Sequence, residues 1–134
     1  MVRQNREITP AIAVDFDGTL CNLAWPRIGD PNTPLIKFLI KWREDGNKVI
    51  LWTCRHDKML DDAIDWCRSH GLEFDAVNDN LPDRIAKYGN NSRKVSADYY
   101  IDDLNATALI SSDGECDFIR QRTYADMRWK ELDV

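Results

Sequence analysis

The sequence has few of the side chains from which zinc sites and disulfide frameworks are built. Two histidines and four cysteines occur in 134 residues, and no two cysteines form a C-x-x-C pair. The cysteine spacings match no zinc-binding pattern. We therefore expect free thiols in a reducing, cytoplasmic setting.

Long apolar runs are also missing. No stretch approaches the roughly 18 apolar residues of a membrane-spanning helix. The first ten residues, MVRQNREITP, are mostly polar and do not resemble a signal segment. The net charge of −5 argues against nucleic acid as the main partner, although it is compatible with a local basic rim. We expect no membrane partner.

The composition is that of an ordinary soluble globular protein, with 43% hydrophobic and 31% charged residues. No internal repeat or low-complexity segment divides the chain. At this length, folding buries roughly two-thirds of the surface that the unfolded chain exposes, which is enough for a core. We expect a single domain over residues 1–134, in which residues 1–10 form a tail.

Strand and helix patterns alternate along the chain. Short apolar runs predict buried strands over residues 11–15, 48–53, 72–78 and 97–103. Amphipathic patterns predict helices over residues 33–46, 57–71 and, as the last element, from near Cys116 to Leu132. Loops are expected over residues 18–34 and 80–92, the second with room for one helical turn.

This order is typical of an α/β fold, a Rossmann-like three-layer sandwich with a mainly parallel central sheet and helices on both faces. Thr33 is expected to cap the first long helix, with Pro34 as its first residue. The apolar stripe of that helix consists of Leu35, Phe38, Leu39 and Trp42. The last helix is expected to turn inward Phe118, Ile119, Met127 and Trp129.

Acidic and hydroxyl side chains occur where the expected strands end. Asp15 and Asp17 close the first strand, Thr53 the second, and Asp102 and Asp103 the fourth. Ligands bind beyond the carboxyl ends of such strands, and parallel strands bring these ends to one rim. Carboxylates crowded there raise one another's pKa, and oxygen-only ligands suit Mg²⁺ as the cation that relieves the repulsion.

A rim of this kind suits phosphoryl transfer. The cation and Lys94, which precedes the fourth strand, would neutralise the phosphoryl oxygens. Asp15 would attack phosphorus to give an aspartyl-phosphate. A tight turn at Gly18 would let Asp17 reach the leaving oxygen as general acid and then general base. Arg93 competes with Lys94, whose compact ammonium suits a phosphoaspartate better.

Four elements in order, DFDGT, Thr53, Lys94 and IDD, resemble the four motifs of the haloacid dehalogenase (HAD) superfamily over residues 11–103. The resemblance implies that Asp15 is the nucleophile and a ligand of Mg²⁺. It implies that Asp17 is the acid/base and that its backbone carbonyl also ligates the ion. Members that cleave carbon–halogen bonds lack the second acid, so the resemblance points to hydrolysis of phosphate esters.

The same resemblance assigns the other motif residues. It implies that Thr53 hydrogen-bonds a phosphoryl oxygen and that Lys94 holds the phosphoaspartate. It implies that Asp102 binds Mg²⁺ and that Asp103 supports the ion directly or through water. The alternative for Asp103 is a residue that only solvates the rim.

Response-regulator receiver domains offer a comparison, because they also combine acidic residues, a hydroxyl residue, a lysine and Mg²⁺ on a parallel sheet. There the phosphoacceptor lies on a middle strand. Here the D-x-D-G-T motif follows the first strand, and this order favours a hydrolase.

The chain leaves no room for a cap domain over the site. The predicted helices, strands and loops fill the intervals between Asp17 and Thr53 and between residues 54 and 93. The sequence therefore predicts an open site without a cap. An open site gives a reason to expect a large substrate or a homo-oligomer in which a neighbouring subunit closes the site.

The loop over residues 18–34 is expected to face the substrate. Trp25 and Arg27 would stack on or pair with the leaving group, or the loop is simply packed by one aromatic with a solvated arginine. Contacts with the substrate are also assigned to Phe16, Gly18, Cys54 and Arg55. Arg55 would touch phosphate or form an ion pair with a nearby aspartate, and the alternative for Cys54 is a small buried hydrophobe.

The sequence thus predicts a Mg²⁺-dependent phosphatase that hydrolyses a phosphate monoester through phospho-Asp15. One alternative is a non-catalytic phosphate-binding or interaction module with the same fold, and the retained acid/base Asp17 argues against it. Another is a phosphatase that acts on a nucleic-acid end, and the acidic balance argues against that. Sugar phosphates, nucleotides and phosphoproteins stay open as substrates.

Overall fold

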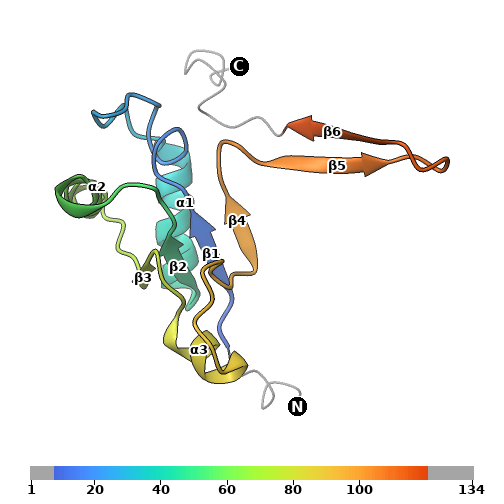
Figure 1. The fold of residues 1–134 in the computed structure, drawn as a ribbon. Coiled ribbons are helices and arrows are strands. Elements are labelled where there is room, and N and C mark those ends of the chain that lie inside the picture. Colours follow the sequence, from blue (N-terminus) through green and yellow to red (C-terminus); the bar gives the residue numbers. More distant parts are fainter. Residues whose placement is uncertain (1–7, 121–134) are drawn as a thin grey trace.

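A parallel sheet forms the centre of the protein in its computed structural model, which describes residues 8–120. The strand order is β3-β2-β1-β4 and every neighbouring pair is parallel (Figure 1). The strands are β1 (Ala11–Val14), β2 (Lys48–Leu51), β3 (Ala76–Val77) and β4 (Tyr99–Ile101). Helices flank the sheet, which confirms the predicted mixed α/β fold.

Buried apolar runs explain the two central strands. All four residues of β1 are buried, as are the last three of β2, because the strands lie inside the sheet and are covered on both faces. The ladder continues one residue beyond the strand ends, where Asp15 N donates to Ile101 O and Trp52 N donates to Val14 O, both at 2.9 Å. The polar residues that follow β1 therefore begin from a fixed backbone.

The two long helices pack on one face of the sheet. α1 (Thr33–Glu44) contributes Ile36 and Leu39, and α2 (Asp57–Ser69) contributes Ala63 and Cys67, to a core with alternate residues of β1 and β2. The opposite face packs Ala11, Ala13 and Ile50 against Leu81 and Val95. Leu81 and Val95 belong to the connection from β3 to β4, which runs from one edge of the sheet to the other and covers this face.

Asn32, and not Thr33, caps α1. The Asn32 side-chain oxygen accepts from Leu35 N at 3.3 Å, and its amide nitrogen donates to Thr19 O at 2.9 Å. Asn32 is buried, so one side chain joins the loop to the helix. Phe38, expected in the apolar stripe, is exposed, and Ile36 takes the buried position.

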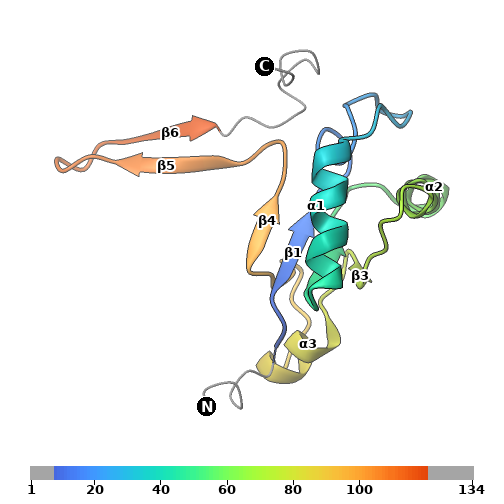
Figure 2. The same cartoon turned by 180° about the vertical axis from the view of Figure 1, so that it is seen from behind.

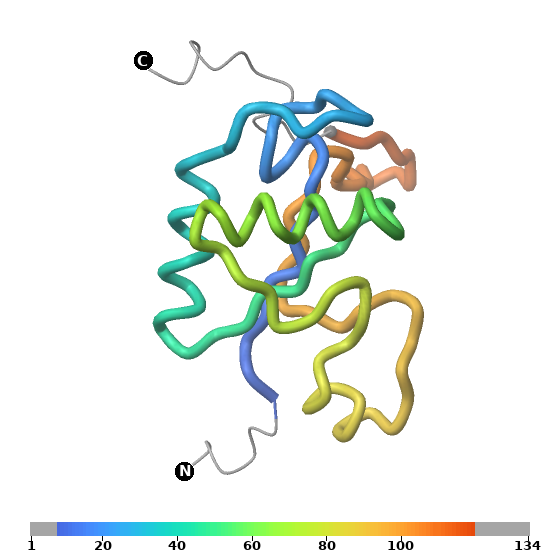
Figure 3. Tube along the Cα trace, turned by 90° about the vertical axis from the view of Figure 1, so that its left-hand side faces the viewer, coloured from blue at the N-terminus to red at the C-terminus, as the bar shows by residue number. Residues whose placement is uncertain are grey.

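A third helix, α3 (Pro82–Tyr88), stands where the sequence predicts mostly loop. Pro82 lies in its first turn and Gly89 ends it in the left-handed region, with φ of 75°. Arg84 is buried and forms an ion pair with Asp98 just before β4. α3 therefore lies near the amino ends of the strands, and the loop after β1 lies at the opposite end (Figure 3).

The expected helix from Cys116 is wrong over the described residues. β5 (Ala106–Ile110) and β6 (Cys116–Arg120) instead form an antiparallel hairpin that projects away from the sheet (Figures 1 and 2). Its turn contains Asp113 and Gly114, which has φ of 90°. Phe118 and Ile119, predicted to turn inward, are exposed. The rest of that predicted helix, with Met127 and Trp129, lies outside the described residues.

None of the helices within residues 8–120 has both the length and the apolar character that crossing a membrane requires.

Leu39→Ala is expected to lower the free energy of unfolding by about 2–5 kcal/mol, because it opens a cavity between α1 and the sheet. Leu109→Ala is the matched control, since Leu109 is 45% exposed on the hairpin and Leu39 is 0% exposed. The control is expected to change stability by at most about 0.5 kcal/mol. Urea unfolding measures both, and equal losses would contradict the core described above.

Candidate functional site

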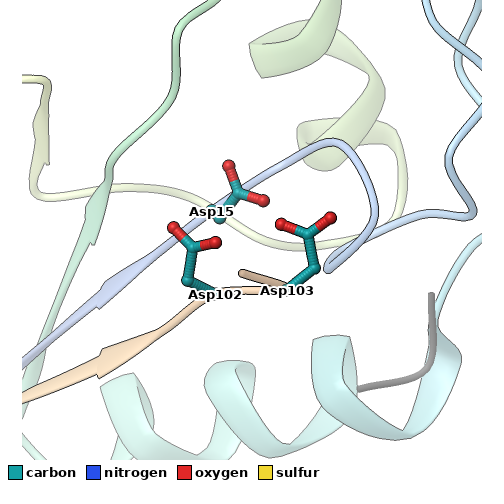
Figure 4. A group of neighbouring side chains, drawn as sticks. All are labelled: Asp15, Asp102 and Asp103. Atoms are coloured by element: carbon teal, nitrogen blue, oxygen red, sulfur yellow. The ribbon is translucent and has the colours of Figure 1, made fainter. Parts of the chain in front are cut away.

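Three carboxylates meet at the carboxyl ends of β1 and β4. Asp15 follows β1, and Asp102 and Asp103 follow β4. The parallel register pairs Val14 with Ile101, which places the residues after each strand side by side. One oxygen from each carboxylate lies within 4.8 Å of the others (Figure 4). The structure thus brings together three of the residues that the sequence singled out.

Burial and mutual repulsion disfavour the charged forms of these acids. Burial, followed by the charge of Asp102, raises the pKa of Asp15 to about 8. Burial and a hydrogen bond with Asp102 also raise the pKa of Asp103. Opposing this, the Thr19 hydroxyl donates to Asp15 Oδ2 at 3.0 Å and lowers the pKa of Asp15. Full ionisation of this group therefore calls for a counter-charge.

A hard divalent cation fits this group of residues. The available atoms are carboxylate oxygens alone, which are the ligands that such cations prefer. A bound cation would also lower the repulsion that raises the pKa of Asp15. The group could therefore hold a metal ion.

Asp17 lies outside the group of three and pairs with Arg55. The guanidinium binds both carboxylate oxygens, with Nε to Oδ2 and Nη2 to Oδ1 at 2.8 Å each. Gly18, with φ of 83°, turns the backbone directly after Asp17. Arg55 is only 2% exposed, so the pair is largely shielded from solvent. Of the two alternatives for Arg55, the structure shows the ion pair with a nearby aspartate.

Arg55 also holds the loop over residues 18–34. Its Nη2 donates to the carbonyl oxygens of Pro26 at 3.3 Å and Arg27 at 3.1 Å. The guanidinium lies 5.0 Å from the ring centroids of Trp25 and Phe16. The side chains of Trp25 and Arg27 are exposed. Phe16 is fully buried in the core, and its predicted contact with the substrate stays a prediction.

A cavity of about 250 Å³ opens beside Asp15. The residues that line it are Asp15, Trp52, Thr53, Cys54, Asn78 and Asp102. The Thr53 hydroxyl oxygen accepts from Arg55 N at 3.1 Å, which leaves the hydroxyl proton free to donate. Cys54 is exposed, so it is not the small buried hydrophobe that was the alternative.

Thr19 and Asn78 belong to this site, although no role was predicted for either residue. The signal for Thr19 was its place in the DFDGT motif, four residues after Asp15. Asn78 directly follows β3 of the parallel sheet. Thr53 and Asp102 were predicted to be site residues because they occupy the same kind of position at a strand end. Roles at strand ends were predicted only for acidic and hydroxyl side chains, so the amide of Asn78 was missed.

Lys94 is not joined to the three carboxylates. It lies in the segment that leads into β4, and its ammonium is 5.5 Å from the ring centroid of Tyr100. Within residues 8–120, no ion pair links Lys94 to a carboxylate. The predicted contact of Lys94 with a phosphoaspartate therefore stays a prediction.

Comparison with known proteins gives one informative likeness. No family model matches the chain, and no curated protein matches it. Among solved structures, the chain is similar to a conserved protein from Bacteroides thetaiotaomicron, with 38% sequence identity and a TM-score of 0.64 over 82% of this chain and 84% of that one. At that identity and coverage, the protein belongs to the same family as this conserved protein.

The stability of the metal-free protein is expected to fall as the pH rises from about 4 to about 8. The raised pKa of Asp15 means that the folded state binds a proton more tightly than the unfolded state. Each pH unit in this window therefore lowers the free energy of unfolding by up to about 1.4 kcal/mol per retained proton. Urea unfolding in a chelating buffer measures the slope.

Asp102→Asn removes a repelling charge and should flatten that slope, whereas Asp61→Asn on the exposed side of α2 should not. Mg²⁺ should raise the stability of the wild type most at the upper end of the pH range. Identical slopes in the wild type and Asp102→Asn would show that carboxylate crowding does not govern this group.

Arg55→Met is expected to lower the free energy of unfolding by about 3–5 kcal/mol, because it leaves Asp17 shielded and unpaired. Adding Asp17→Asn should recover part of the loss, since the unpaired charge is then gone. Arg27→Ala is the control, because the Arg27 side chain is exposed, and about 0.5 kcal/mol or less is expected. A double variant whose loss equals the sum of the single losses would argue against the coupling.

Proposed function

We propose that the protein is a Mg²⁺-dependent phosphatase that hydrolyses phosphate monoesters through an aspartyl-phosphate on Asp15. The observation that carries this proposal is the group formed by Asp15, Asp102 and Asp103, whose oxygens lie within 4.8 Å of one another beside an open cavity. One oxygen of Asp15 is held by Thr19, which leaves the other for attack.

Asp15, Asp102 and Asp103 would hold the cation, together with the backbone carbonyl of Asp17. Bound Mg²⁺ supplies positive charge that keeps Asp15 ionised near neutral pH and offsets the charge of a phosphoryl group. Burial alone favours the protonated form of Asp15, which is not a nucleophile. This gives the proposed activity a strict requirement for a divalent cation.

The chemistry then follows from the residues of the site. A carboxylate oxygen of Asp15 would bond to phosphorus while the bond from phosphorus to the leaving oxygen breaks, and the leaving oxygen would take the proton of the Asp17 carboxyl group. Water would next attack the phosphorus of phospho-Asp15 and give a proton back to Asp17, which releases inorganic phosphate and restores the Asp15 carboxylate. The free hydroxyl proton of Thr53 donates to a phosphoryl oxygen in both steps.

The proposed role of Asp17 requires movement. Asp17 would reach the leaving oxygen as general acid only after its carboxylate parts from Arg55. Lys94 would hold the phosphoaspartate, and its ammonium lies 5.5 Å from the ring centroid of Tyr100. A substrate that displaces the loop containing Trp25 would weaken the ion pair between Asp17 and Arg55, because Arg55 also binds this loop.

A capless, HAD-like fold and a cytoplasmic setting belong to the same proposal. The cavity beside Asp15 suits a phosphorylated substrate, and its open form gives a reason for assembly into a homo-oligomer.

A non-catalytic phosphate-binding module is the second candidate. Two contacts favour it, since Asp17 is held by Arg55 and Lys94 lies over Tyr100. This candidate predicts that the protein binds Mg²⁺ and phosphate but hydrolyses no phosphomonoester. A panel of phosphomonoesters therefore separates the two candidates.

Asp15→Asn is expected to abolish hydrolysis of an aryl phosphate, because an amide is not a nucleophile here. EDTA should abolish hydrolysis as well, and added Mg²⁺ should restore it. Asp61→Asn makes the same change on the exposed surface of α2 and should keep full activity. Full activity in Asp15→Asn would defeat the assignment of the nucleophile.

A further inference from the structure

Asn78 lies in the wall of the cavity beside Asp15, held on two sides. It follows β3 directly, and its backbone N donates to Leu51 O at 2.7 Å. Its φ of 52° lies in the left-handed region, which asparagine tolerates better than most side chains. The hydrogen bond to β2 therefore fixes the backbone from which the Asn78 side chain projects.

The hydrogen bond to Thr53 fixes which way the amide of Asn78 faces. Thr53 N donates to Asn78 Oδ1 at 2.8 Å. A backbone N–H can only donate, so the oxygen of the amide must face Thr53 and the NH₂ group must face away from it. One side chain thus positions Thr53 and presents two N–H donors of its own.

These two donors are unused. Asn78 Nδ2 forms no hydrogen bond with any part of the chain that the structure describes, although the residue lines the cavity. The charged residues in the cavity wall are Asp15 and Asp102, which only accept hydrogen bonds when they are ionised. A phosphoryl group there would have three acceptor oxygens and few donors to meet them.

We infer that Asn78 is a phosphate-binding residue, whose side-chain NH₂ donates to a phosphoryl oxygen while its carbonyl oxygen keeps Thr53 in place. This inference rests on the proposed function and deepens it. A phosphoryl group in the cavity would then meet the Thr53 hydroxyl and the Asn78 amide as a pair of neutral donors. The ammonium of Lys94 is not needed for this contact.

Asn78→Asp tests the inference with little change of shape. The aspartate retains an oxygen for Thr53 N and tolerates the left-handed backbone, but it replaces the NH₂ group with an oxygen. The value of kcat/KM for an aryl phosphate should fall roughly 10- to 100-fold, the range for a hydrogen bond to a charged group. The affinity for inorganic phosphate, measured by calorimetry with Mg²⁺ present, should fall similarly.

Two further variants separate the lost donor from the added charge. Asn78→Gly keeps the backbone conformation and removes the donors without adding charge, and it also removes the oxygen that accepts from Thr53 N, which Asn78→Asp retains. It should weaken phosphate binding about tenfold. Asn90→Asp adds the same charge on the exposed loop after α3 and should change neither activity nor phosphate affinity. Urea unfolding confirms that each variant is folded.

The outcomes distinguish this inference from the proposed function. If the wild type hydrolyses the phosphate and Asn78→Asp matches Asn90→Asp, the inference is overturned and the phosphatase stands. If the Asp variant alone is weakened and the Gly variant is not, added charge explains the loss and the inference is again overturned. If the wild type binds phosphate without turnover and both Asn78 variants weaken binding, the inference stands and the phosphatase fails.

Discussion

The crowding of carboxylates at the ends of β1 and β4 is the constraint on which this site depends. Parallel pairing of the two strands forces Asp15 beside Asp102, and burial then raises the pKa of Asp15 to about 8. A fold that only needed stability would gain by replacing one of these acids, because each deprotonation works against its neighbours. A cation would offset the charge of the cluster, and this links the proposed metal ion to the proposed nucleophile Asp15.

The two acids of the DFDGT motif meet opposite environments although one residue separates them. Asp15 faces other carboxylates, whereas Asp17 faces the guanidinium of Arg55. An extended strand would place both side chains on one face, so the separation arises because the backbone leaves β1 after Val14 and turns at Gly18, which has φ of 83°. The site thus has one acid whose pKa is raised by burial and by neighbouring charge, and one that is paired with Arg55, which also binds the loop that carries Trp25.

The parts that could be predicted from the sequence are those set by local pattern. Buried apolar runs located β1 and β2, and parallel connectivity then placed Asp15 and Asp102 together. The hairpin was missed because residues around Phe118 were assigned to a helix and the turn signal at Asp113–Gly114 was not used. From the sequence, Arg55 could contact phosphate or pair with an aspartate. The pairing with Asp17 could not be predicted, because the two residues are distant in sequence and meet only in the folded protein.

Asn78 shows where prediction from sequence ends and why. The role of Asn78 depends on its left-handed backbone conformation after a short strand and on the hydrogen bond from Thr53 N to its side-chain oxygen. Neither feature can be predicted from the sequence of this segment. Neutral donors also suit this cavity better than a fixed cation would. An ammonium beside Asp15 would lower the pKa of that carboxyl without a metal and would weaken the dependence on the ion. With Lys94 near the ring of Tyr100 and an amide in the cavity wall, the proposed cation would be the positive charge that controls the ionisation of Asp15.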